Sequence, residues 1–162
     1  MPQVFKPAVL TDDGADLLSK VTAGKSSIEF VRMAVGEGVY SGDEKNTEFL
    51  QQLETLRAER NTYTFSDHEQ YSRHSVKLTA VISNRSPDGR ESLVDEGYYI
   101  NEIAVYAKEA GQGEGTEIMF SIAVTAGEHG DYMPPYNGFS PAQITQDYYV
   151  TVHNSEHVTV IT

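Results

Sequence analysis

Apolar and polar side chains alternate over residues 71–83, and this pattern limits the choice of fold more than any other in the chain. One side of the pattern consists of Val76, Leu78, Ala80 and Ile82. The other side consists largely of Ser75, Lys77, Thr79 and Ser83. Because successive side chains of a β-strand point to opposite faces, this pattern predicts a strand with one buried face. A Ser-Pro-Asp-Gly sequence follows at 86–89 and predicts a turn.

Other segments of strand-like composition are separated by turn residues. They are residues 27–35, 97–107, 117–125, 143–153 and 157–161. Residues 27–35 are largely apolar on both faces, which predicts a central strand. The expected faces are Ile28, Phe30, Arg32 and Ala34 on one side and Val31, Met33 and Val35 on the other. The glycines of 111–115 predict a hairpin connection, and the breakers of 127–141 predict a long loop.

Two short helices are predicted in the N-terminal third of the chain. Residues 11–20 form the first, with Thr11 as its N-cap and acidic residues in its first turn. Gly14 lowers the helix propensity of this segment. Residues 47–56 form the second, with Thr47 as its N-cap. Its apolar stripe, which we expect to pack into the core, is Phe49, Leu50, Leu53 and Leu56.

These elements together indicate an α+β fold that is mainly β. We expect an antiparallel sheet or a sandwich-like domain with about two short helices near the N-terminus. The length suits a single domain, residues 1–162, because domains commonly contain about 100–150 residues. No internal repeat, heptad pattern or linker divides the sequence.

Composition narrows the classes of function. The chain has no cysteine, which excludes disulfides, thiolate metal sites and cysteine nucleophiles. Its net charge of −12 disfavours nucleic-acid binding, which normally requires a basic surface. The N-terminus lacks the apolar stretch of a secretory signal, and no apolar run approaches the roughly 20 residues of a membrane helix. We therefore expect a protein that is made in the cytoplasm and has neither a nucleic-acid partner nor a membrane-inserted segment.

No segment matches a motif of enzymatic chemistry. Residues 23–26 contain Gly-Lys-Ser, but Ser19 stands where a phosphate-binding loop requires its first glycine, and a strand follows where a helix should. No serine lies in a nucleophile motif. Glu102 lies between apolar strand neighbours, so we expect it to be partly buried beside a structural partner such as Arg32. The interpretation is a protein that is not an enzyme and has no catalytic residue, cofactor or metal ligand.

The histidines are the strongest candidates for a metal site, and they fall short of one. His68 and His74 are six residues apart, which places both rings on one face of an extended segment. His129 lies near Asp131, and a further pair is formed by His153 and His157. A zinc site needs three or four converging ligands, which this spacing does not demand. An ion held on a symmetry axis by several copies of the chain stays open.

Several motifs resemble a known family when they are taken in order. They are residues 11–14 with 28–38, residues 97–107, and residues 130–138 followed by a closing strand that ends at 158–160. In order and spacing they resemble the N-terminal tail-collar region of bacteriophage tail fibre proteins, over nearly the whole chain. Asn101 and Ala104 depart from the Arg and Gly that this family often has there. Such fibres usually continue into a shaft, so we expect a short prophage version or a trimmed chain.

The resemblance implies a structural component of a phage or prophage tail that joins a tail fibre to the baseplate or tail tip. It implies a homotrimer located in the virion tail, with baseplate or tail-tip proteins as partners. The predicted interface residues, chosen partly because tyrosine is enriched at interfaces, are Tyr98, Tyr99, Glu102, Tyr132, Pro134, Tyr136 and Asn137. Ordinary strand packing is the alternative for these tyrosines. The alternative functions are a carbohydrate-binding module that contacts the host cell surface and, with less support, a hydrolase.

Overall fold

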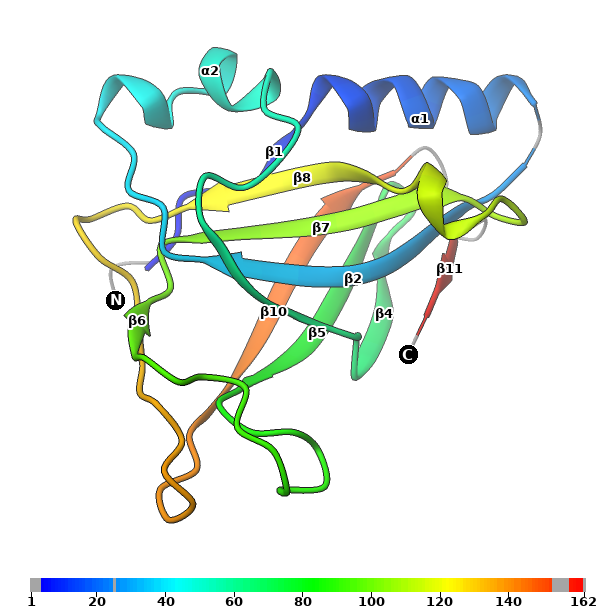
Figure 1. The fold of residues 1–162 in the computed structure, drawn as a ribbon. Coiled ribbons are helices and arrows are strands. Elements are labelled where there is room, and N and C mark those ends of the chain that lie inside the picture. The colour runs from blue at the N-terminus through cyan, green and yellow to red at the C-terminus, as the bar shows by residue number, and fades with distance from the viewer. Residues whose placement is uncertain (1–3, 25, 153–157, 162) are drawn as a thin grey trace.

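A six-stranded and a three-stranded β-sheet make up most of the structure, a computed structural model that describes residues 4–24, 26–152 and 158–161. The larger sheet has the strand order β1-β8-β7-β2-β11, and β3 also pairs with β2. Its strands are β1 (Val9–Leu10), β2 (Ile28–Gly36), β3 (Glu59–Tyr63), β7 (Glu102–Glu109), β8 (Ile118–Val124) and β11 (Val158–Val160). Figure 1 shows that the strands of the smaller sheet cross them steeply.

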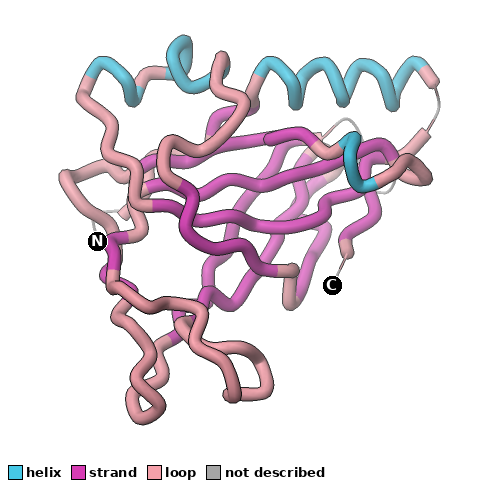
Figure 2. Tube along the Cα trace, in the orientation of Figure 1, coloured by secondary structure: helices cyan, strands magenta, loops and turns pink. Residues whose placement is uncertain are grey.

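The smaller sheet has the strand order β10-β5-β4, and a separate two-stranded ribbon joins β6 to β9. The strands of the sheet are β4 (Asp67–Ser72), β5 (Ser75–Ser83) and β10 (Gln143–Thr151). The ribbon consists of β6 (Tyr98–Tyr99) and β9 (Tyr132–Met133). The helices are α1 (Asp12–Ala23), α2 (Thr47–Gln51) and the short 3-10 turns η1 (Asp43–Lys45) and η2 (Glu114–Thr116). Figure 2 shows α1 and α2 together along one side of the larger sheet.

The expected fold class is confirmed, because the chain is mainly β, its sheets are largely antiparallel and it has two α-helices. Among the strands that the structure describes, the exception to antiparallel pairing is β11, which runs parallel to β2. Within the part of the chain that the structure describes, no helix is long and apolar enough to cross a membrane.

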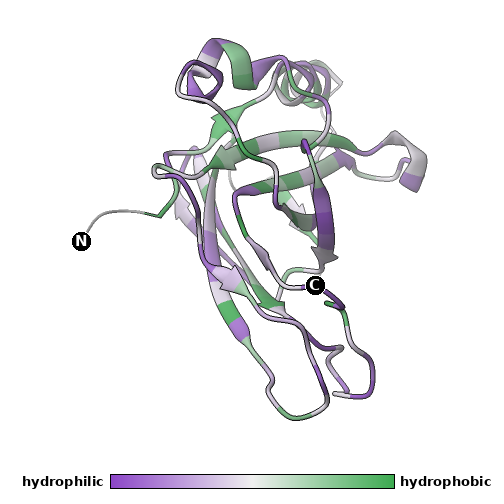
Figure 3. Ribbon diagram, turned by 60° about the vertical axis from the view of Figure 1, so that its left-hand side comes forward, coloured by the Kyte–Doolittle hydropathy of each residue, from purple (hydrophilic) through white to green (hydrophobic). Residues whose placement is uncertain are grey.

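Two apolar clusters lie on the two faces of the larger sheet. The first fills the space between the sheets, and at its centre Phe30 of β2 meets Phe120 of β8 edge to face, with ring centroids 5.1 Å apart. The second lies under α2 and includes Tyr40, Leu50 and Tyr106. Figure 3 shows the hydrophobic colouring concentrated in the strands that these clusters join.

The expected faces of residues 27–35 are wrong beyond Phe30. The pairing of β2 with β7 shifts register between Phe30 and Arg32, which is a β-bulge. One extra residue at this point turns Met33 and Val35 to the same face as Phe30, so all three lie in the cluster between the sheets. Ala34 faces the other cluster.

Two further segments differ from expectation at their ends. Residues 71–83 are not one strand, because β4 and β5 form a hairpin that turns at 73–74, although Val76, Leu78, Ala80 and Ile82 are all buried as expected. The second helix ends at Gln51, and its N-cap is Asn46, whose side chain accepts a hydrogen bond from Phe49 N–H. Leu56 is buried, but it lies outside the helix.

The N-cap of α1 also joins the helix to the larger sheet. Thr11 Oγ1 accepts a hydrogen bond from Gly14 N–H at 2.9 Å, as the sequence predicts, and donates one to the carbonyl of Met119 in β8. The helix continues to Ala23, three residues beyond the expected end, and Gly24 follows as its C-cap. The single hydroxyl therefore fixes both the start of α1 and its position over the sheet.

Replacing Thr11 with alanine should lower the free energy of unfolding by about 1–2 kcal/mol, because a lost N-cap costs roughly that amount. Urea unfolding followed by circular dichroism measures the change. Thr11→Ser keeps the oxygen and should recover most of the loss, whereas an unchanged midpoint for Thr11→Ala would show that the cap carries no stability.

Candidate functional site

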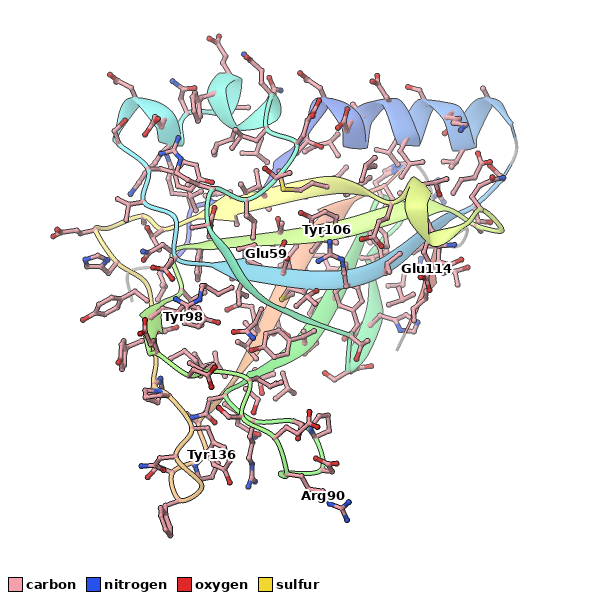
Figure 4. The ribbon with its side chains drawn as sticks, in the orientation of Figure 1. Glu59, Arg90, Tyr98, Tyr106, Glu114 and Tyr136 are labelled. Atoms are coloured by element: carbon pink, nitrogen blue, oxygen red, sulfur yellow. The ribbon has the colours of Figure 1, made fainter. Side chains whose placement is uncertain are left out.

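The β6–β9 ribbon joins two segments that the sequence marked as interface. Tyr98 pairs with Met133 and Tyr99 pairs with Tyr132. Because side chains alternate along a strand, one pair points inward and the other outward. Tyr98 and Met133 are buried, at 4% and 0% exposed, whereas Tyr99 and Tyr132 are 45% and 51% exposed. Tyr98 lies on the side of the ribbon that faces the core (Figure 4), where it packs against other side chains. The outward pair, Tyr99 and Tyr132, lies on the surface.

The exposed rings are ordered against one another. Tyr99 stacks on His129 with centroids 4.4 Å apart and planes at 20°, and it lies 5.2 Å from the ring of Tyr132. We call these three residues the aromatic surface. Gly97 permits the arrangement, because a Cβ at this position would collide with the hydroxyl of Tyr132. The three rings therefore form a preformed, partly apolar patch on the outside of the molecule.

The loop that carries the aromatic surface is fixed at its base by backbone contacts and one amide side chain. Ile100 N–H donates to Asp131 C=O at 2.8 Å. The carbonyl oxygen of the Asn101 side chain accepts from Gly130 N–H at 3.0 Å, and its NH₂ group donates to Glu37 C=O at 3.1 Å. The buried amide thus holds the start of this loop against the end of β2.

Glu102 is fully buried and lies below the surface, not in it. Its carboxylate accepts four hydrogen bonds of 2.6–2.9 Å from the hydroxyl of Tyr40 and the N–H groups of Gly38, Arg57 and Ala58. The side chain therefore ties two loops to the larger sheet. Gly38 must be small, because a Cβ there would lie 2.5 Å from the carboxylate. Glu102 therefore has a structural role within the chain, and its place in an interface stays a prediction.

The expected pairing of Glu102 with Arg32 is wrong. Glu102 lies opposite Gly36 in the β2–β7 ladder, whereas Arg32 lies opposite Tyr106. The Arg32 guanidinium stacks 3.8 Å above the Tyr106 ring, and its Nε donates to Glu117 at 2.8 Å. Tyr106 lies on the outward face of the larger sheet (Figure 4).

Arg57 lies at the rim of the Glu102 site and binds a second carboxylate. Its two terminal nitrogens contact Glu44 at 3.0 and 2.8 Å, and this guanidinium lowers the pKa of Glu44 to about 2. The same guanidinium lies 4.4 Å above the ring of Tyr40. Burial, followed by the hydrogen bond to Glu102, raises the pKa of the Tyr40 hydroxyl above its usual value.

The remaining predicted interface residues lie on a projecting arm, residues 134–142, which connects β9 to β10. Pro134 and Tyr136 are half-buried and Asn137 is exposed. The Asn137 side chain accepts hydrogen bonds from Phe139 and Ser140 N–H groups at the tip, where Phe139 is 87% exposed. Figure 4 shows Tyr136 in this arm, at a distance from Tyr98. The seven predicted residues therefore divide between the ribbon, the Glu102 site and the arm.

Asn84, which was not among the predicted residues, anchors the base of the arm. Its NH₂ group donates to the carbonyls of Pro134 and Ser140 at 3.2 and 3.3 Å, and its Oδ1 accepts from Ala142 N–H at 2.9 Å. The residue is fully buried. One sequence signal could have identified it. Asn84 lies between a strand and the Ser-Pro-Asp-Gly turn, where Asn side chains commonly form hydrogen bonds with the backbone.

The histidines do not converge where the structure describes them. His68 belongs to β4, His74 lies in the turn after it, and His129 belongs to the aromatic surface. His153 and His157, and Lys25 of the Gly-Lys-Ser sequence, lie outside the described residues. Among the described residues, no three His, Asp or Glu side chains are placed to hold a metal ion.

Tyrosine ionisation provides a test of this packing. Burial raises the pKa of five of the ten tyrosines, which are Tyr40, Tyr63, Tyr98, Tyr106 and Tyr148. An unfolded tyrosine has a pKa of about 10, so the unfolded chain loses these protons first. Their contribution to stability is therefore complete below pH ~10 and is lost as the pH rises above that value. We expect the rise in absorbance at 295 nm that these five tyrosines contribute to occur above pH ~10.

This rise should coincide with the loss of the far-ultraviolet circular dichroism signal. Ionisation of all five tyrosines near pH ~10 with the fold intact would contradict the burial of their hydroxyls. Tyr148→Phe should reduce the rise that accompanies unfolding.

None of the protein-family models, curated proteins or solved structures compared with the chain matches it. The likeness to tail-collar proteins therefore depends on the motifs within this sequence.

Proposed function

We propose that the chain is an attachment module of a phage or prophage tail, which joins a tail fibre to the baseplate or tail tip and associates with copies of itself. The observation that supports this proposal most is the aromatic surface. Tyr99 and Tyr132 are 33 positions apart in the sequence, and the β6–β9 ribbon brings them together as exposed neighbours. Aromatic residues, tyrosine above all, are enriched at protein interfaces and supply much of their binding energy.

The rigidity of the surface favours binding. Ordering a flexible side chain on association costs about 0.5–1.5 kcal/mol, and rings already stacked on one another avoid part of that cost. Tyr99 and Tyr132 are held by each other and by the ribbon, whose loop is fixed through Asn101. A partner would therefore meet a patch whose shape is set before contact.

Solution mass tests self-association. We expect light scattering coupled to size exclusion to give a trimer of three times 17.9 kDa, about 54 kDa. The double substitution Tyr99→Ala with Tyr132→Ala should shift the equilibrium toward monomer. Tyr71→Ala is the matched control, because Tyr71 is 66% exposed and pairs with another ring on the smaller sheet. A monomer at every concentration, for the unchanged chain, would refute self-association by this domain.

The attachment role needs a separate measurement. Antibodies against the chain should label the tail end of particles that the strain encoding it releases after prophage induction, in negatively stained electron micrographs. Label at the distal fibre tips, or particles that carry no label, would contradict the proposal.

The aromatic surface also favours one second candidate, a carbohydrate-binding module. Exposed rings stack on sugars, and Asp131 beside Tyr132 is an exposed carboxylate that can accept hydrogen bonds from sugar hydroxyls. A glycan array decides between the two, because this candidate predicts hits that the double tyrosine variant loses. Binding to no glycan, together with labelled tail ends, would leave the attachment role.

A further inference from the structure

The outer edge of β10 presents backbone donors that have no partner among the residues described. Val152 N–H donates to His74 C=O at 2.8 Å, and Asn84 N–H donates to Ala142 C=O at 3.1 Å. Residues 142 and 152 therefore both bond toward β5, and the intervening register has no shift. In an antiparallel ladder, residues two apart share the same orientation, so the even-numbered residues bond to β5. The N–H groups of the odd-numbered residues, among them Thr145, Asp147 and Tyr149, point away from it.

The two edges of the smaller sheet differ in how they are protected. Natural sheets block their edges with charged residues, proline, bulges or short strands. On β4 the edge is six residues long, carries Asp67 and Glu69, and has a register shift near its end. The β10 edge is nine residues long, and Asp147 is its sole charged residue; it has no proline and no register shift. Apart from Asp147 and the hydrogen bond that Gln146 Nε2 donates to the Asp147 carbonyl at 2.9 Å, this edge has none of these protections, and an edge of this length favours the addition of another strand.

A groove of about 630 Å³ runs along this edge. One wall is residues 146–149 of β10, and the other is residues 4–8, which bond to the end of β8 through Lys6 N–H and Val4 C=O at 2.9 Å each. Its floor includes the buried side chains of Ile103 and Ala123. A strand occupies about 3.3 Å by 4.8 Å by 10 Å per residue, or about 160 Å³. The groove thus has the volume of about four strand residues.

We propose that this groove binds an extended segment of a partner protein, which adds as a strand along β10 and closes the gap to residues 4–8. Its inward side chains would be small and apolar, because they meet Ile103 and Ala123. Its outward side chains would include a lysine or arginine opposite Asp147. This inference is independent of the proposed function, since it uses neither the aromatic surface nor the tail-collar motifs.

Charge supports a basic segment over an acidic one. The groove is lined by two carboxylates, Asp131 and Asp147, and by one cation, Lys6. Lys6 Nζ already donates to Lys45 C=O at 3.3 Å. The chain as a whole carries a net charge of −12, which attracts cationic segments from a distance. Strand addition supplies the remaining affinity through backbone hydrogen bonds.

A random heptapeptide library selected against the full chain, followed by amide hydrogen exchange with the enriched peptides, tests the proposal. We expect peptides that alternate Val, Ile or Thr with Lys or Arg and that slow exchange at Thr145, Asp147 and Tyr149. Enrichment of no peptide, or of peptides that leave these three amides unprotected, would overturn it. Protection that grows with protein concentration alone would indicate a second copy as occupant and would overturn the choice of a partner.

Two substitutions separate the groove from the rest of the sheet. Asp147 and Asp67 both lie opposite Thr79 of β5, one on each edge, so lysine at either position changes the net charge equally. Asp147→Lys should weaken an enriched peptide about tenfold, and Asp67→Lys should leave its affinity within about twofold. Methylating the peptide nitrogens that face β10 should also cost about tenfold or more. Equal effects of the two lysine variants would refute the groove as the site.

Discussion

Replacing Glu102 with alanine should lower the free energy of unfolding by about 3–5 kcal/mol, because it leaves several buried donors without an acceptor. The carboxylate accepts from the Tyr40 hydroxyl and from three backbone N–H groups, and the residue is fully buried. The backbone donors cannot rotate toward solvent, because they belong to the loops that Glu102 holds. Urea unfolding followed by tyrosine fluorescence and circular dichroism measures the loss.

An isosteric substitution separates the effects of the negative charge and of the hydrogen-bond acceptors from the effect of side-chain volume. Glu102→Gln fills the same space but turns one acceptor into a donor that faces other donors, so it should cost about 2–4 kcal/mol. Glu114→Gln is the control in η2, which follows the other end of β7 and where the side chain is exposed, and it should change stability by less than about 0.5 kcal/mol. A loss below about 1 kcal/mol for Glu102→Ala would mean that water replaces the carboxylate and that the two loops do not depend on it.

The parts of the fold that the sequence predicted are those that local periodicity encodes. The alternation of buried and less buried residues in β5 and the Thr11 cap of α1 depend on neighbours within a few residues. Both features are found as the sequence predicts. The sequence marked the ribbon tyrosines as a group and did not separate Tyr98 from Tyr99. Alternation separates them once the ribbon is known, because adjacent residues of a strand face opposite sides.

The parts that escaped prediction depend on backbone far away in the sequence. The bulge in β2 arises from its pairing with β7, some 75 residues later, and nothing within residues 27–35 marks it. The same holds for the four donors of Glu102, three of which are backbone N–H groups that carry no side-chain signature. We expected Glu102 to pair with Arg32 because their charges are opposite. In the structure, the carboxylate instead accepts hydrogen bonds from uncharged N–H and O–H groups.

Gly14 shows how such a contact reverses an ordinary expectation about a helix. In an exposed helix, alanine is more stable than glycine by roughly 0.5–1 kcal/mol, so Gly14→Ala would be expected to stabilise α1. A Cβ at this position, however, would overlap the backbone carbonyl oxygen of Phe120 in β8 and would lie 3.0 Å from Leu10 Cδ1. The glycine therefore has a packing reason, which is the close approach of α1 to the sheet.

We expect Gly14→Ala to lower the free energy of unfolding by about 2 kcal/mol or more, because overpacking a tight contact costs about 1–3 kcal/mol and exceeds the gain in helix propensity. The obstacle is backbone, which cannot rotate away as a side chain can. The helix must then move outward, and Leu17 and Val21 leave the cluster between the sheets. Ser19→Ala is the matched control on the exposed side of α1, and it should be neutral or slightly stabilising. A higher thermal midpoint for Gly14→Ala would mean that α1 lies farther from β8 than in the structure. It would also contradict the role of Thr11 in joining the helix to the sheet.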